Sequence, residues 1–244
     1  MINFNDYNKL RKLLLDPNYT VRIFETPIDV ELQKEYFAFS SELRKENNKQ
    51  ADYLSQVWQL YDPTVPIEDK KRILCMLASV DNIDYYRSLE QFEKMAPDEL
   101  KNWATLALYE SKTIIESGFL NSNMVIVSSG LGAKNNSLRY FIVLIAKNDE
   151  GFSTLQYDII RNETEFAFRE QGGEVEEINK DGRFVKIVCL LPIEQYIGEL
   201  IQSIIRLCNT FGDFLAEDFI LTNTKLLSVQ DIENFLKESG RKNK

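Results

Sequence analysis

The chain has 244 residues, of which 44% are hydrophobic and 27% charged, the composition of an ordinary globular protein. Its net charge is −9, shared almost evenly by the two halves, so the sequence offers no basic platform and disfavours nucleic acid as a partner. The complete absence of histidine excludes hydrolases of the Ser-His-Asp and Cys-His kinds, HExxH metalloproteases and most zinc enzymes.

The N-terminus and the cysteines both indicate a cytoplasmic protein. Residues 1–16 carry charges and no uninterrupted apolar run, which is not the pattern of a signal peptide. No window approaches about eighteen uncharged apolar residues, so no membrane span is predicted. Cys75, Cys189 and Cys208 each lie inside an apolar run. This pattern predicts small buried side chains in a reducing compartment rather than metal ligands or nucleophiles.

Residues 1–121 are predicted to be mostly helical. Apolar residues recur at helical spacing over several segments, and the segments end at proline or asparagine. One short segment, Tyr19 to Ile23, is expected to be extended. The predicted helices cover residues 6–15, 30–45, 51–61 and 83–95, and two more begin at Pro66 and Pro97.

The helices that begin at Pro66 and Pro97 resemble each other. They align without a gap at proline, glutamate, lysine and leucine, and each places acidic residues near the positive end of the helix dipole. With its proline, acid, basic residue and small alanines, the second helix resembles a HEAT-type repeat, and the resemblance covers residues 66–117. It implies a surface for protein partners rather than a catalytic site. Because two units are visible, a helical bundle whose helices begin alike is the alternative.

Residues 122–244 are predicted to mix strands and helices. The signals for turns and helix ends are Gly172-Gly173, the hairpin sequence Asn179 to Gly182, and Gly212. The predicted strands are 124–128, 138–146, 174–178, 184–191 and 214–222, and the predicted helices are 150–170, 192–211 and 228–238.

This half also repeats itself. A shift of 45 residues aligns residues 142–166 with residues 187–211 without a gap. The resulting order, β-α-β-β-α-β, is the ferredoxin-like plan, an antiparallel sheet with two helices on one face. The predicted fold class is therefore α+β. A helical, HEAT-like domain over residues 1–121 precedes a ferredoxin-like domain over residues 122–244, which has an extra leading strand and a C-terminal helix.

The segment 128–141 is the candidate site. Glycines let backbone N–H groups approach an anion, and lysine or arginine adds positive charge. Neither the P-loop nor the dinucleotide fingerprint is present, and a strand rather than a helix follows. The alternative is a plain connection, in which glycines supply positive φ angles and asparagines tolerate them. The candidate ligand or partner residues are Gly130, Gly132, Lys134, Asn135, Asn136 and Arg139.

The densest acidic group lies in the predicted strand 174–178 and the turn after it. Strand alternation places Glu174 and Glu176 on one face and Glu177 on the other. A solvated edge strand is therefore expected rather than a metal site, since charge protects an edge from pairing with further strands.

The sequence predicts binding rather than chemistry. Tyr140 and Phe141 are neighbouring aromatics, but the strand at 183–188 lacks the aromatic series of an RNA-recognition motif. We expect a non-enzymatic intracellular adaptor with a protein partner, with self-association as an option, and with neither nucleic acid nor a membrane as partner. The alternative is a sensor or enzyme that binds a small anion or nucleotide at residues 130–139. No cofactor, metal or catalytic residue is predicted.

Overall fold

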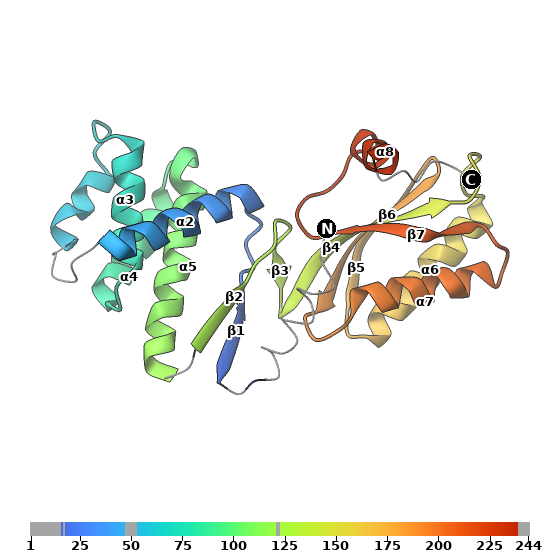
Figure 1. The fold of residues 1–244 in the computed structure, drawn as a ribbon, viewed down its shortest axis with the longest axis horizontal. Helices are drawn as coiled ribbons and strands as arrows, with labels where there is room; N and C mark the ends of the chain where they lie inside the picture. Colours follow the sequence, from blue (N-terminus) through green and yellow to red (C-terminus); the bar gives the residue numbers. More distant parts are fainter. Residues whose placement is uncertain (1–15, 17, 47–52, 121–122, 239–244) are drawn as a thin grey trace. The chain divides into compact units, whose positions relative to one another are not determined.

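The structure is a computed structural model that describes residues 16, 18–46, 53–120 and 123–238 (Figure 1). Its internal contacts form two compact units. Among the described residues, one unit contains residues 18–24 and Ile28–Val127, and the other contains Glu25–Pro27 and the chain from Ser128 onward. The predicted boundary between residues 121 and 122 stays a prediction. Among the described helices, none is long and apolar enough to cross a membrane.

The first unit is built mainly from helices. Asn82 caps α4 by accepting hydrogen bonds from the backbone N–H groups of Asp84 and Tyr85. Helix α3 has two acidic residues in its first turn, where their negative charge interacts favourably with the positive end of the helix dipole. The elements are β1 (Tyr19–Ile23), α2 (Val30–Glu46), the 3-10 helix η1 (Leu54–Leu60), α3 (Ile67–Ala78), α4 (Ile83–Met95), α5 (Asp98–Leu120) and β2 (Asn123–Val127).

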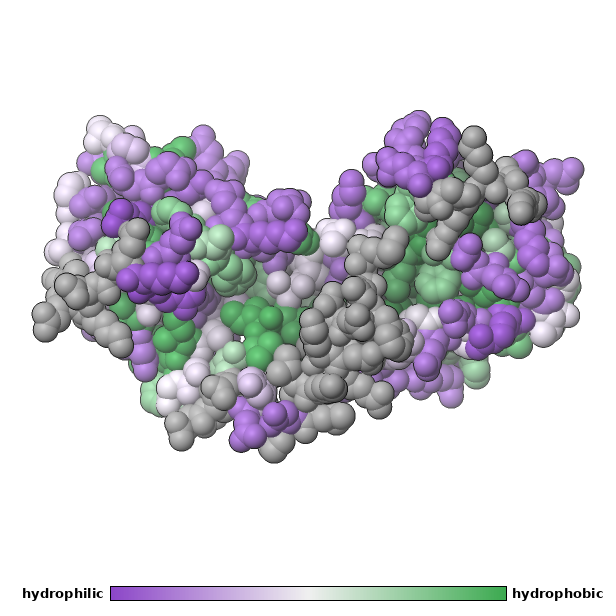
Figure 2. Space-filling view, viewed as in Figure 1, coloured by the Kyte–Doolittle hydropathy of each residue, from purple (hydrophilic) through white to green (hydrophobic). Residues whose placement is uncertain are grey.

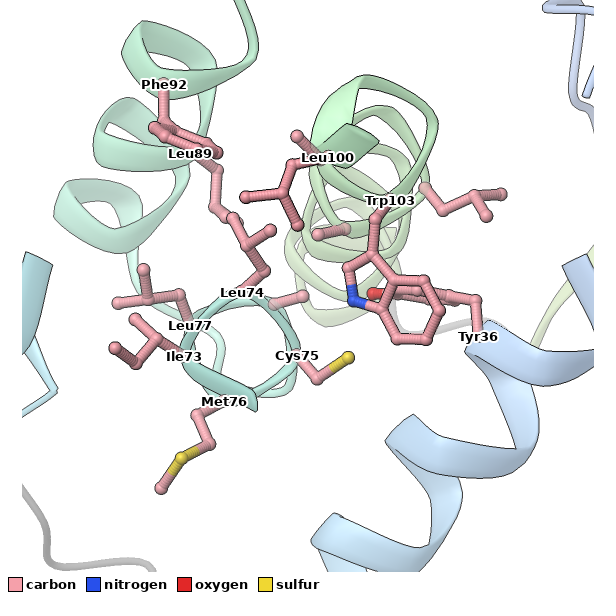
Figure 3. Packing of buried hydrophobic residues seen from close by; sticks show 14 of the residues in the cluster. Tyr36, Ile73, Leu74, Cys75, Met76, Leu77, Leu89, Phe92, Leu100 and Trp103 are labelled. Carbon is pink, nitrogen blue, oxygen red and sulfur yellow. The ribbon is translucent and has the colours of Figure 1, made fainter. Parts of the chain in front are cut away.

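Helices α2, α3, α4 and α5 share one apolar core (Figure 3). Leu74 from α3 and Leu89 from α4 are completely buried, and Leu100 begins the buried side of α5. The rings of Tyr36 and Trp103 meet edge to face with their centroids 5.2 Å apart. This edge-to-face contact joins α2 to α5 and adds to the area that both rings bury. The resemblance of residues 66–117 to HEAT repeats stays a prediction.

Strand β2 does not extend the sheet of the second unit. It pairs in parallel with β1, residue Tyr19 opposite Asn123 and Ile23 opposite Val127, in a separate two-stranded sheet of the first unit. The expectation of an extra leading strand on the ferredoxin-like sheet is therefore corrected. Its partner lies about a hundred residues earlier in the chain, and local periodicity carries no information on such a pairing.

The second unit has the ferredoxin-like plan, so the α+β fold class is confirmed. The strand order is β7-β4-β6-β5 and each neighbouring pair is antiparallel. Helices α6 and α7 lie on one side of the sheet, and α8 lies on the other (Figure 1). The elements are β3 (Ala133–Lys134), β4 (Ser137–Ala146), α6 (Thr154–Glu170), β5 (Glu174–Asp181), β6 (Phe184–Pro192), α7 (Ile197–Asn209), β7 (Leu215–Thr222) and α8 (Val229–Glu238).

Several predicted boundaries differ from the structure. Helix α6 begins after Ser153, whose side chain forms a capping box with Gln156, rather than at residue 150. The hairpin turn comes two residues later than expected, because Asp181 still pairs with Phe184. The segment 51–61 forms a 3-10 helix over Leu54–Leu60, and the helix predicted for 6–15 lies outside the described residues.

Candidate functional site

The segment 128–141 is a tight hairpin between β3 and β4. Lys134 pairs with Ser137, and the two residues between them, Asn135 and Asn136, have φ angles of 50° and 63°. Two left-handed residues in a two-residue loop make a type I′ turn, whose twist matches the flanking strands, and asparagine tolerates this conformation well. Gly132 also has a positive φ, of 73°. The predicted connection, with glycine and asparagine at positive φ, is therefore present.

Position 130 requires glycine because another stretch of backbone lies very close to it, not because of its φ angle. A Cβ atom there would lie 1.8 Å from the carbonyl oxygen of Thr224. The next residue, Leu131, donates its N–H to the carbonyl of Asn223 at 3.1 Å. The start of the segment is thus packed against the chain that leads from β7 to α8.

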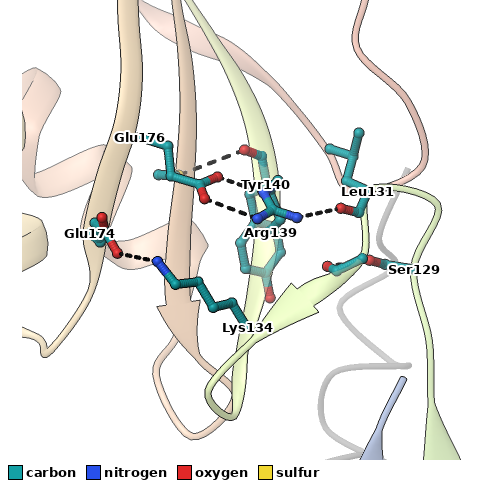
Figure 4. A network of polar contacts seen from close by, with 9 residues as sticks. Ser129, Leu131, Lys134, Arg139, Tyr140, Glu174 and Glu176 are labelled. Carbon is teal, nitrogen blue, oxygen red and sulfur yellow. Dashed lines mark hydrogen bonds and ion pairs between the residues drawn. The ribbon is translucent and has the colours of Figure 1, made fainter. Parts of the chain in front are cut away.

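The predicted cations of the segment are held by carboxylates (Figure 4). Arg139 donates to both oxygens of Glu176, at 2.5 Å from Nε and 2.9 Å from Nη2, and its Nη1 donates to the carbonyl of Leu131 at 2.8 Å. Lys134 lies 3.4 Å from a carboxylate oxygen of Glu174. The hydrogen bonds with Arg139 lower the pKa of Glu176, and the same bonds raise the pKa of the arginine.

Carboxylates also meet the predicted asparagines. The backbone N–H of Asn135 donates to the Glu25 side chain at 3.2 Å, and the Asn136 amide donates to Glu194 at 3.1 Å. The structure thus brings the predicted site residues together. Lys134, Asn135, Asn136 and Arg139 each meet a carboxylate, an arrangement that disfavours a small free anion in the turn itself.

A third cation, Lys186, completes a row that the sequence did not reveal. It lies on β6 opposite Val143, and its Nζ is 2.6 Å from Asp181. Residues opposite each other in antiparallel strands share a face, and alternation along β4 puts Arg139 and Val143 on the same face. Lys134, opposite Ser137, belongs to this face too. Three neighbouring strands thus each present one cation.

We call this side of the sheet the α8 face, defined in β4 by Arg139, Phe141, Val143 and Ile145. The acids that pair with its three cations all come from β5. The register of β5 shifts between Val175 and Glu177, a bulge that puts two residues opposite one. The predicted strict alternation of the three glutamates is corrected by this bulge.

The centre of the α8 face is apolar and aromatic. Phe141 on β4 and Phe184 on β6 belong to one buried cluster with Ile232 and Leu236 of α8. The side chains of Phe141 and Phe184 are only 4% and 2% exposed. In the space-filling view, apolar atoms of this unit gather over the strands between α8 and α7, and hydrophilic atoms cover the helices (Figure 2). Helix α8 therefore occupies the side of the sheet that lacks α6 and α7.

The described residues of this unit also form a hollow of about 610 Å³ beside α7. Its acidic lining includes Asp213, which pairs with Lys147, and Asn209 is engaged by two hydrogen bonds to the backbone of Leu215. Across the described part of the chain, no group of three or more Cys, Asp or Glu side chains is placed to hold a metal ion. The lining residues are Gln202, Ile205, Arg206, Asn209, Thr210, Asp213, Glu217 and Asp218.

Among the described residues of the helical unit, Glu110 is a buried carboxylate that the sequence did not reveal. Tyr36 donates to it at 2.6 Å, Ser40 donates at 2.9 Å, and Arg44 lies 2.7 Å away. Burial, followed by the negative charge of Glu110, raises the pKa of Tyr36 well above its ordinary value. Because each polar group has a partner, this network is a structural connection between α2 and α5.

Comparisons with known proteins give structural neighbours only. No protein-family model and no curated protein matches the sequence. One neighbouring structure, from Deinococcus radiodurans R1, is provisionally named a transposase; it has 9% identity and a TM-score of 0.34, over 44% of this chain and 92% of that chain. Another is a REP-associated tyrosine transposase bound to a REP hairpin, with 11% identity and a TM-score of 0.32, over 45% of this chain and 70% of that chain.

These neighbours contradict two predictions. Both are named as transposases and one is bound to a nucleic-acid hairpin, against the expectation of a non-enzymatic adaptor and against the expectation that nucleic acid is not a partner. Both expectations are withdrawn. At such low TM-scores the likeness carries no argument for what this chain does, so its function is argued below from the chain's own residues.

Proposed function

We propose that the second unit binds single-stranded nucleic acid across the α8 face of its sheet. The observation that carries the proposal is the arrangement of that face. Lys134, Arg139 and Lys186 come from three neighbouring strands, and the two central strands add Phe141 and Phe184. Cations that follow a phosphate backbone, beside aromatic rings on which bases stack, are the two components of single-strand recognition on antiparallel sheets.

The cations are available to phosphates at moderate cost. The side chains of Lys134 and Glu174 are 51% and 58% exposed, and an exposed ion pair of this kind contributes only about 0–1 kcal/mol. The bidentate pair of Arg139 with Glu176 is more strongly held, because it is half as exposed and doubly hydrogen-bonded. A phosphate offers the same bidentate geometry as a carboxylate, so it can replace Glu176 without moving the guanidinium.

The acidic strand β5 sets the limits of this binding. Its carboxylates compete with phosphate for the three cations, and the net charge of −9 repels a polyanion at long range. We therefore expect weak binding that is strongest at low salt. Replacing Glu176 with Gln removes one competitor. It is expected to tighten binding several-fold, a change in binding free energy about equal to the net contribution of one hydrogen bond.

Fluorescence anisotropy of the full chain with a labelled oligonucleotide of about 12 nucleotides tests the proposal, in about 50 mM salt. Changing both Arg139 and Lys186 to Ala is expected to weaken binding at least tenfold, because two of the three proposed phosphate contacts are lost. Arg87→Ala removes an exposed cation from the helical unit and serves as the matched control.

Equal loss in the Arg87 control, or no binding by the unaltered chain, would refute the proposal. A duplex of the same sequence is measured in parallel. Preference for the duplex would also count against it, because stacking on Phe141 and Phe184 requires unpaired bases.

We also propose a reducing, cytoplasmic location. This proposal is supported by the three free cysteines, Cys75, Cys189 and Cys208, which are all buried. Burial raises the pKa of the Cys75 thiol to about 12 and that of Cys208 to about 11, so both stay protonated and unreactive.

A further inference from the structure

Helix α8 occupies the surface on which bases would stack. Its buried side chains Ile232 and Leu236 pack against Phe141 and Phe184, in a cluster that also contains Ile220 of β7. The helix has ten residues, a length at which an isolated helix is marginal in water. Its stability therefore depends on these apolar contacts with the sheet.

The side chains of Ser228, Gln230, Asp231 and Asn234 make local hydrogen bonds. Ser228 and Asp231 form a capping box, in which the Ser228 hydroxyl accepts from the Asp231 N–H at 3.1 Å and the Asp231 carboxylate accepts from the Ser228 N–H at 2.9 Å. Gln230 donates to Asn234, one turn later. Among the described residues, these side-chain contacts join α8 to itself rather than to the sheet, so no polar bond between these groups and the strands needs to break when the helix leaves.

The chain before α8 is held to the sheet at Asn223 and Thr224, and Leu227 packs against the apolar cluster beneath the helix. The carbonyl of Asn223 accepts from the Leu131 N–H, and the backbone of Thr224 packs directly against Gly130. Leu226, two residues further on, is 55% exposed. Release of the helix therefore requires Leu227 and Val229 to leave the cluster with it, while the strand β7 stays paired with β4.

We infer that α8 is a displaceable cap that competes with single-stranded nucleic acid for the α8 face. The inference rests on the proposed function, because the cap needs a ligand to exclude. It makes the affinity of the chain depend on the fraction of molecules in which α8 is detached, since only these expose Phe141 and Phe184.

Substitutions within α8 test the cap. Ser228→Ala removes the N-cap and loosens α8, whereas Asn234→Ala raises helix propensity at an exposed position and tightens it. Ile232→Ala is a second loosening variant that weakens the contact with the sheet. None of these residues belongs to the proposed binding groups.

Two readouts are needed for each full-length variant: hydrogen exchange of the α8 amides without ligand, and affinity for the labelled oligonucleotide. Loosened variants are expected to exchange faster and bind about threefold to tenfold tighter, and the tightened variant to do the reverse. Faster exchange with unchanged affinity would overturn the cap and the stacking on Phe141 and Phe184, whereas binding through Lys134, Arg139 and Lys186 would stand. Absence of binding in every variant would overturn both.

Discussion

At the scale of single residues, Glu110 shows how a buried charge is accommodated. Tyr36, Ser40 and Arg44 converge on its carboxylate from α2, at distances of 2.6 to 2.9 Å. Three donors replace the water that burial removed, so the carboxylate remains satisfied inside the core. Glu110 therefore adds a polar connection to the apolar contact between α2 and α5.

Replacing Glu110 with Ala is expected to lower the free energy of unfolding by about 3 kcal/mol, because it leaves the Tyr36 and Ser40 hydroxyls buried without their acceptor. Urea unfolding followed by circular dichroism measures the change. Glu31→Ala, which breaks an exposed pair with Lys34, is the control and is expected to cost less than about 0.5 kcal/mol. Equal effects of the two substitutions would contradict this account of Glu110.

The pair of Arg139 with Glu176 is expected to make stability depend on pH. Hydrogen bonds from Arg139 lower the pKa of Glu176 in the folded state. A depressed pKa means that the pair stabilises the fold above the unfolded-state pKa of glutamate, about 4.3, and that this contribution disappears as the pH falls through the lower folded-state value. Unfolding of the unaltered chain and of Glu176→Gln, measured from about pH 7 to about pH 3, should therefore converge in acid. Curves that stay parallel would contradict the assignment.

At the scale of elements, Gly130 fixes the path from β7 to α8. Gly130→Ala places a Cβ atom 1.8 Å from the Thr224 carbonyl oxygen, which is backbone and cannot rotate away. We expect a loss of about 2 kcal/mol or more in thermal or urea unfolding. Gly198 lies in helix α7, and its nearest neighbour to a new Cβ is at 3.4 Å. Gly198→Ala should therefore be neutral or stabilising by up to about 1 kcal/mol, and a similar loss in both variants would contradict the difference.

Local patterns predicted most of the elements and the plan of the second unit. The repeat of strand, helix and strand, with β-branched residues in strands and helical spacing between them, is encoded within short windows and survives in β4 to β7. The turn at Asn135 and Asn136 was equally readable, because asparagine tolerates positive φ.

Long-range pairings and their consequences were not readable from the sequence. The partner of β2 is β1, the β5 bulge shifts its glutamates, and α8 covers Phe141. Each depends on segments that meet only in three dimensions, so period and propensity carry no signal for them. The same applies to Lys186, whose place in the row of cations follows from the register of β6 with β4.

At the scale of the whole molecule, net charge says little about the partner of any one face. A value of −9 counts all residues equally, whereas an interface depends on the charges of one face. On the α8 face, Lys134, Arg139 and Lys186 each pair with a carboxylate of β5. Under the proposed function, counter-ions and carboxylates compete with phosphate there, so binding is expected to depend on salt.

The salt dependence of oligonucleotide binding tests the central claim most directly. If phosphates bind the three cations, the slope of log K against log salt for a single strand is about −2, and Arg139→Ala reduces its magnitude by about 0.7. A slope near zero, or a slope unchanged by the Arg139 substitution, would contradict the claim that the α8 face of this sheet binds nucleic acid.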